Sequence, residues 1–65
     1  MVQAALDQLP MEQRAVFVLH ELDEQSAPEV AEALGTPLNT VYSRLRLARE
    51  RFRAAVEALQ KGEEP

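Results

Sequence analysis

Apolar residues recur at intervals of three and four along the second half of the chain, which is the spacing of one face of an α-helix. At about 100° per residue these positions form one stripe facing the rest of the domain, with polar residues opposite. The pattern predicts a long C-terminal helix beginning near Thr36 and Pro37, residue types suited to a helix cap and a first turn. The stripe consists of Leu38, Val41, Leu45, Ala48, Phe52, Val56 and Leu59.

The first third of the chain contains two shorter helical patterns separated by a proline. Residues 2–8 are predicted to form a short helix that ends near Leu9, because Pro10 disfavours a helical conformation in the residue before it. Residues 10–22 are predicted to form a second helix. We expect its larger apolar residues to belong to the core, with a docking surface as the alternative for any apolar surplus on this helix. These residues are Met11, Val16, Phe17 and Leu22.

A third helix is predicted between Ser26 and Gly35. Ser26 and Glu29 have the spacing of a capping box, and Gly35 readily adopts the left-handed conformation that follows a helix end. Together these patterns predict an all-α fold, a small bundle of about four helices. We expect one domain over residues 1–61 and a frayed tail over residues 62–65.

Residue content argues against several classes of site. The 65-residue chain has no cysteine, which excludes a disulfide framework and a thiolate metal centre and agrees with a cytoplasmic location. No apolar run approaches the roughly 20 residues needed to cross a bilayer, so no membrane partner is expected. His20 is the single histidine, and neither Ser26 nor Ser43 has a recognisable base beside it. We therefore expect no enzyme activity, catalytic residue, metal or cofactor.

The charges are divided unevenly along the chain. The net charge is −4, yet residues 1–35 contain seven Asp or Glu against one Arg, whereas residues 36–65 contain six Arg or Lys against four Glu. Five arginines lie between positions 44 and 53, within the predicted last helix. A basic stripe of this kind matters more to a polyanion than the total charge does.

The last two predicted helices match the description of a helix-turn-helix, in which a short helix and a turn with glycine precede a recognition helix. Short polar side chains on the outer face of the last helix can reach base edges, and flanking arginines can meet phosphate or guanine. The alternative is a plain helical bundle with a solvated basic face. The candidate DNA-binding residues are Asn39, Thr40, Ser43, Arg44, Arg46, Leu47, Arg51 and Arg53.

Several motifs occur together in an order that resembles region four of bacterial sigma factors, and above all the extracytoplasmic-function (ECF) group. They are Leu9-Pro10, Arg14-Ala15-Val16-Phe17, the stretch from Ser26 to Gly35, Thr40-Val41-Tyr42-Ser43-Arg44-Leu45 and Ala48-Arg49. The resemblance covers about residues 5–59. The helix-turn-helix of LuxR-type response regulators is a second resemblance, but its recognition helix usually continues with His and Lys.

The sigma-factor resemblance implies that the last helix recognises the minus-thirty-five element of promoter DNA. It also implies docking on the beta-subunit flap of RNA polymerase core and control by an anti-sigma factor. Thr40, Ser43 and Arg44 match family positions at the DNA face, whereas Arg49 fits a structural ion pair as well as a phosphate contact. Tyr42 and Leu47 depart from the family pattern, because Lys or Arg is frequent at both positions.

A function of another class stays open beside DNA binding. The acidic total charge and Leu47 are compatible with an interaction module whose main partner is an anti-sigma factor or a polymerase subunit. DNA contact would then be secondary. We expect the isolated domain to be a monomer or a weak homodimer.

Overall fold

The computed structural model describes residues 2–62, and this part of the chain contains helices and connections without any β-strand. The prediction of an all-α bundle of about four helices is confirmed. Residues 63–65 of the predicted frayed tail lie outside the described residues. In chain order the elements are α1 (Val2–Asp7), α2 (Met11–Phe17), the π-helical turn η1 (Val18–Leu22), α3 (Ala27–Leu34) and α4 (Leu38–Gly62).

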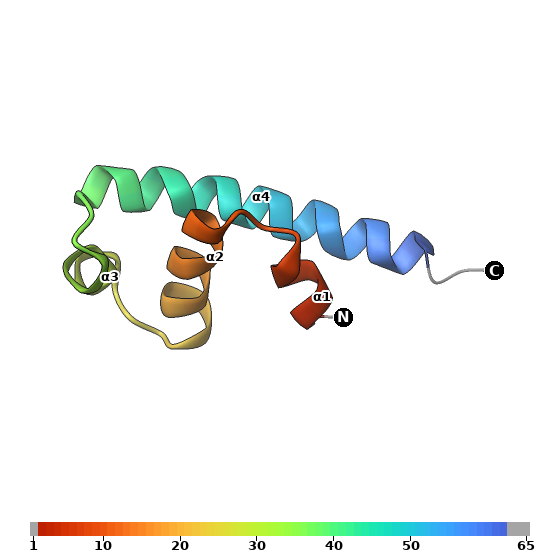
Figure 1. Ribbon diagram of the computed structural model, residues 1–65, viewed down its shortest axis with the longest axis horizontal. Coiled ribbons are helices and arrows are strands. Elements are labelled where there is room, and N and C mark those ends of the chain that lie inside the picture. The colour runs from red at the N-terminus through yellow and green to blue at the C-terminus, as the bar shows by residue number, and fades with distance from the viewer. Residues whose placement is uncertain (1, 63–65) are drawn as a thin grey trace.

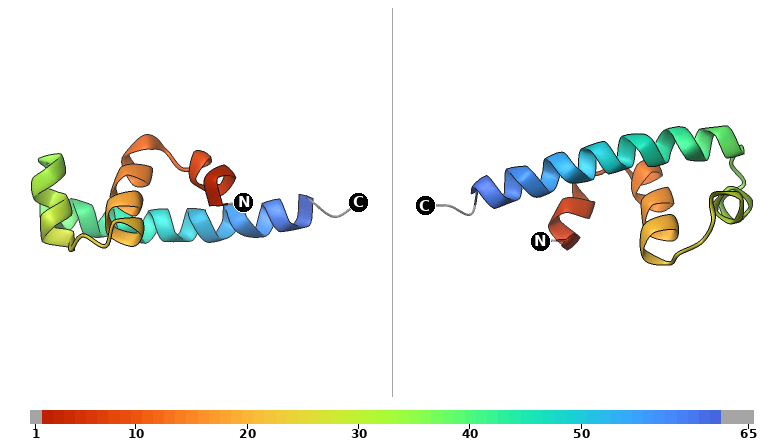
Figure 2. Two further views of the ribbon diagram at one scale, coloured as in Figure 1. Left: turned by 90° about the horizontal axis from the view of Figure 1, so that it is seen from below. Right: turned by 180° about the vertical axis from the view of Figure 1, so that it is seen from behind.

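The longest helix, α4, forms the spine of the molecule (Figure 1). The three shorter helices all lie on one side of it, with α3 near its N-terminal end, α2 at its middle and α1 further along (Figures 1 and 2). Figure 1 views α3 nearly end-on while α4 lies across the page, so these two helices cross at a steep angle. This crossing is the geometry of a helix-turn-helix pair, and it leaves the other side of α4 uncovered.

Both ends of α3 have the caps that the sequence predicts. At its start, the Ser26 N–H donates to Oε1 of Glu29 (2.7 Å) and the Glu29 N–H donates to Oγ of Ser26 (3.2 Å), which completes the capping box. At its end, Gly35 has a φ of 62°. The Gly35 and Thr36 amides donate to the carbonyls of Glu32 and Ala31, at 3.3 and 2.9 Å. These two hydrogen bonds form the Schellman motif, so the turn between α3 and α4 is fixed on both sides.

The start of α4 differs by one residue from the prediction. Pro37 rather than Thr36 supplies the first helical carbonyl, which accepts from the amides of Thr40 and Val41 at 3.0 and 3.1 Å. The Thr36 hydroxyl instead donates back to the Leu34 carbonyl at 3.4 Å. Thr36 does not begin α4 because its backbone amide already donates to the Ala31 carbonyl in the Schellman motif. It is therefore the last residue of the turn that follows α3.

The helix predicted over residues 10–22 is helical from Met11, but its last turn is π-helical. The Asp23 amide donates to the Val18 carbonyl five residues earlier, at 3.0 Å. Glu24 then takes a left-handed conformation with a φ of 58°. A residue with a Cβ atom adopts this region far less readily than glycine does, so the connection from η1 to α3 holds a locally strained residue.

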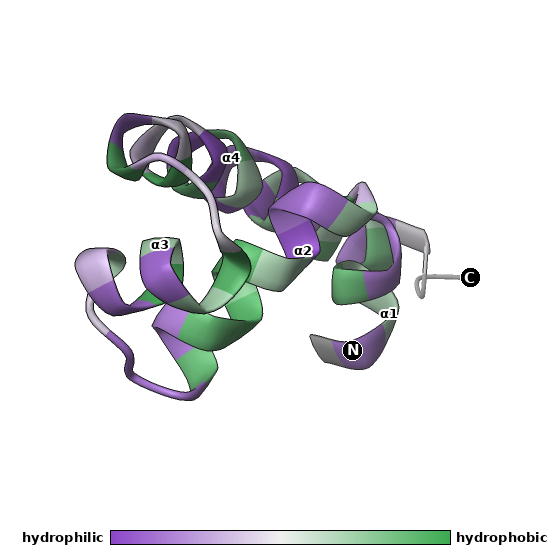
Figure 3. Cartoon of the chain, turned by 60° about the vertical axis from the view of Figure 1, so that its left-hand side comes forward, coloured by the Kyte–Doolittle hydropathy of each residue, from purple (hydrophilic) through white to green (hydrophobic). Residues whose placement is uncertain are grey.

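The core consists of two hydrophobic clusters that share α2. The α3 cluster contains Val16, Ala27, Val30, Val41 and Leu45, and the α1 cluster contains Leu6, Leu9, Phe17 and Ala48, with Phe52 packed against it. Adjacent residues of α2 therefore enter different clusters. Figure 3 shows the hydrophobic part of α2 facing α3 in the middle of the molecule. The Phe17 and Phe52 rings stack with centroids 4.8 Å apart.

The predicted apolar positions are only partly buried. Val16 and Phe17 are core residues as expected, but Met11 and Leu22, which we also expected there, are 80% and 51% exposed. Val16 and Phe17 lie on the face of α2 that packs against the core, so Met11, on the opposite face of the same helix, points to solvent. In the stripe on α4, Leu38 is 41% exposed because it lies at the helix start, whereas Ala55, outside the predicted stripe, is buried.

Candidate nucleic-acid interface

The predicted DNA-binding residues all belong to α4 and none of them is buried. Thr40 and Arg44 are half-buried at the edge of the helix packing, and the other candidates are exposed. At 100° per residue Thr40, Arg44, Leu47 and Arg51 follow one another along a single row, and Ser43 lies beside it. This row lies outside the buried stripe of Val41, Leu45 and Ala48. The remaining candidates are Asn39, Arg46 and Arg53.

The five arginines of α4 differ in what they contact inside the domain. Within residues 2–62, no carboxylate lies within 4.0 Å of Arg44, Arg51 or Arg53. Arg46 lies along the helix from Glu50, with a distance of 3.6 Å between Nη1 and Oε2, and both side chains are well exposed. Such an i,i+4 pair is weak and easily exchanged. Four of the five guanidinium groups are therefore accessible to an outside anion.

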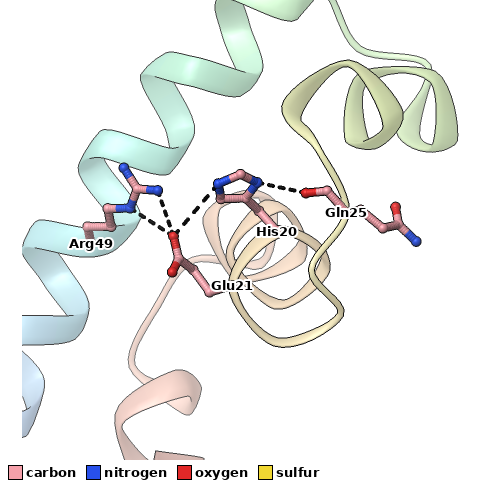
Figure 4. Close-up of polar contacts among 4 residues, drawn as sticks. All are labelled: His20, Glu21, Gln25 and Arg49. Carbon is pink, nitrogen blue, oxygen red and sulfur yellow. Dashed lines mark hydrogen bonds and ion pairs between the residues drawn. The ribbon is translucent and has the colours of Figure 1, made fainter.

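Arg49 is the exception, because it is engaged within the domain. Its Nε and Nη2 both donate to Oε2 of Glu21, at 2.9 and 2.6 Å (Figure 4). Of the two roles that the sequence left open for Arg49, the structure contains the ion pair. The two residues are 28 positions apart, and no local pattern in the sequence indicates that they meet.

His20 extends this contact toward the connection that precedes α3. Its Nδ1 lies 2.8 Å from the carbonyl oxygen of Gln25, and its Nε2 lies 3.9 Å from the same Glu21 oxygen that Arg49 contacts (Figure 4). The side chain is half-buried. The ring therefore links η1 to the loop that leads into α3.

Several apolar side chains of α2 and η1 are only partly covered, with Met11 and Leu22 exposed and Ala15, Val18 and Leu19 half-buried. A shallow hollow on this surface is lined by Met11, Ala15, Val18, Leu19 and the stem of Arg14. Met11 stands at its rim with 80% of its surface exposed. The apolar surplus of this helix is therefore exposed, which is the condition for a docking surface.

Within the part of the chain that the structure describes, no helix has the length and apolarity required to cross a bilayer. The same residues contain no group of three or more His, Cys, Asp or Glu side chains arranged to hold a metal ion.

The helix-turn-helix geometry and the basic outer face of α4 agree with a comparison against protein families. Residues 1–52 match the family model described as "Sigma-70, region 4". The chain belongs to this sigma-70 region 4 family. The match covers α1 to α3 and α4 as far as Phe52, and so includes all of the predicted DNA-binding residues except Arg53.

The likeness extends to the ECF group within sigma-70 proteins. Over 52 residues the chain is 44% identical to a protein named "ECF RNA polymerase sigma factor SigE" from Mycolicibacterium smegmatis. The aligned stretch covers 80% of this chain and 20% of that protein, so the chain corresponds to about a fifth of its length. No solved structure matched the chain.

Proposed function

We propose that the chain is the promoter-binding region 4 of an ECF sigma factor. In this proposal α4 reads the minus-thirty-five element in the major groove, and the same domain docks on RNA polymerase, which would place it in the cytoplasm. The observation that carries the proposal is the division of side chains on α4. An apolar stripe anchors the helix, while its uncovered surface carries the polar residues and the arginines that have no carboxylate partner within residues 2–62.

The arrangement of the outer row supports separate roles for its members. Ser43 and Arg44 lie in the first two turns of α4, next to the fixed turn after α3, where the backbone position is well determined. Base reading requires this precision, since a bidentate arginine contact to guanine depends on geometry. Arg51 and Arg53 lie further along the helix, where a phosphate contact requires mainly charge. Leu47, between the two groups, offers an apolar contact for a thymine methyl group.

The test begins with selection of the recognised sequence. We would enrich the domain's preferred site from a pool of duplexes with a randomised central stretch. The domain would then be titrated against the selected duplex and a scrambled duplex of equal composition, with fluorescence anisotropy as the readout. The proposal requires tighter binding to the selected duplex, with an affinity that decreases as salt is raised. Equal affinity for both duplexes, from a folded sample, would contradict sequence recognition.

A second candidate function, contact with a protein partner, is supported by the hollow on α2. Met11 extends from a surface whose other lining residues are mostly apolar, and exposed apolar surface of this kind is typical of protein-binding sites. We propose that RNA polymerase core occupies it, with an anti-sigma factor as the competing occupant. The Met11→Asp variant should lose co-purification with polymerase core and keep its DNA affinity. Gln60→Asp, which adds the same charge at an exposed position of α4, is the matched control.

A further inference from the structure

One arginine of the basic helix is held away from outside anions by a contact inside the domain. Both donating nitrogens of Arg49 converge on a single oxygen of Glu21, at 2.9 and 2.6 Å. The side chains of Arg49 and Glu21 are 51% and 35% exposed, so solvent reaches the pair and its contribution to folding stability is modest. Its consequence for the charge of α4 is larger, because a carboxylate from another element neutralises one of five arginines.

Glu21 is held in position on both sides by the surrounding structure. Four residues earlier in the same continuous helical run, Phe17 stacks on Phe52, which lies three residues after Arg49. The ion pair therefore continues a row of contacts between α2–η1 and α4. On its other side the His20 ring lies near the Glu21 carboxylate and is anchored to the Gln25 carbonyl (Figure 4). Arg46 differs from Arg49, because its partner Glu50 belongs to the same helix and both side chains lie on its exposed face.

We propose that Glu21 is a specificity-determining residue of the DNA-binding surface, acting by withholding Arg49 from the phosphate backbone. This inference rests on the proposed function, in which α4 lies against DNA. A phosphate contact strengthens binding to every sequence equally and releases a counterion. A neutralised Arg49 makes no such contact, so a larger share of the binding free energy comes from the row that reads bases. Glu21 itself touches no DNA and is a positioning residue.

The test compares four forms of the domain on a scrambled duplex, where only sequence-independent binding is measured. They are the wild type, Glu21→Gln, Arg49→Gln and the double variant. Glu21→Gln frees Arg49 and should steepen the dependence of log K on log salt by about 0.9. The extra loss of affinity between 50 and 200 mM salt is then about threefold. Arg49→Gln should keep the wild-type slope, and the double variant should match Arg49→Gln.

The preference for the selected over the scrambled duplex should be reduced in Glu21→Gln and retained in Arg49→Gln. Glu32→Gln is the matched control for total charge, since it removes one exposed carboxylate that has no ion pair within residues 2–62. Urea unfolding establishes that each variant is folded. A purely structural role for Glu21 would lower stability and weaken binding to both duplexes, without a steeper salt slope.

Two results would overturn the inference. A shallower slope in Arg49→Gln would mean that the wild-type arginine already contacts phosphate. An unchanged slope in folded Glu21→Gln, including an absence of any binding at the lowest salt, would mean that the freed arginine gains no DNA contact. Failure of the proposed function has a different signature, because it is read from the wild-type preference between duplexes and not from the slope on the scrambled duplex.

Discussion

The two hydrophobic clusters that hold α4 differ in which functional residues they position. The α3 cluster buries Val41 and Leu45 in the turns of α4 that also carry Ser43 and Arg44. The α1 cluster buries Ala48 and packs Phe52 in the turns that carry Arg51 and Arg53. The buried members of both clusters are at most 7% exposed. The α3 cluster therefore supports the residues proposed to read bases, and the α1 cluster supports those proposed to contact phosphate.

The largest expected effect comes from removing an anchor of the α3 cluster. Leu45 is 3% exposed, and its replacement in Leu45→Ala should lower the free energy of unfolding by about 2–5 kcal/mol through lost burial and a cavity. Leu47→Ala changes the same residue type on the exposed face of the same helix, and should change stability by less than about 0.5 kcal/mol. Urea unfolding followed by far-UV circular dichroism measures both. Equal losses in the two variants would contradict the assigned faces of α4.

The next effect separates the two groups of arginines in DNA binding. Arg44→Ala should cost about 1–3 kcal/mol on the selected duplex and little on the scrambled one, because a base contact is lost. Arg53→Ala should weaken binding to both duplexes alike and reduce the salt slope by about one, because a phosphate contact is lost. Anisotropy titrations at several salt concentrations measure both quantities. If Arg44→Ala weakened both duplexes equally, the proposed reading role of the first turns would be wrong.

A smaller effect on stability is expected from the N-terminal cap of α3, the helix that contributes Ala27 and Val30 to the α3 cluster. Ser26→Ala removes the hydroxyl that accepts from the Glu29 amide at 3.2 Å, and should lower the free energy of unfolding by about 1 kcal/mol. Ser43→Ala is the matched control, since Ser43 is exposed within α4 and caps no helix. Chemical denaturation compares the two. A loss in Ser43→Ala as large as that in Ser26→Ala would argue against the cap as the cause.

The smallest effect concerns the pH dependence of the same cap. The hydrogen bond that Glu29 accepts from the Ser26 backbone amide holds the pKa of its carboxyl below the ordinary value, with the Ser26 side chain acting in the same direction. A lowered folded-state pKa stabilises the protein above the unfolded value of about 4.5 and loses this contribution as pH falls through the folded value. The difference in stability between wild type and Glu29→Gln should therefore be constant near neutral pH and shrink in acid. A difference that grows in acid would reverse the assigned sign.

Local signals in the sequence were sufficient for the helices and their caps. The Ser26–Glu29 box and the left-handed Gly35 follow from residue types within a few positions, and the stripe through Val41, Leu45 and Ala48 follows from helical spacing. The solvent-facing position of Ser43, Leu47 and Arg51 follows from the same spacing. Patterns of this range determine which residues share a face, because the geometry of a helix is fixed.

The inner face of α2 was harder to predict, because this segment is apolar on more than one side. Periodicity alone did not distinguish Val16 and Phe17 from Met11 and Leu22, and the choice depended on where α3 and α4 pack. The π-helical turn η1 and the left-handed Glu24 likewise have no local sequence signal of the kind that marks Gly35. Both features occur in the connection between α2 and α3, where the chain must end one helix and reach the start of the next at the place set by the packing of α3.

The sequence by itself determined an all-α chain ending in a helix-turn-helix, the caps of α3 and a basic outer face on α4. The tertiary structure alone decided which arginines are accessible on that face. Glu21 and Arg49 meet because the packing of Phe17 on Phe52 holds α2 against α4 and leaves the Glu21 carboxylate within reach of the Arg49 side chain. Electrostatic pairing depends on distances across the fold, and a contact between residues 28 positions apart leaves no periodic trace in the sequence.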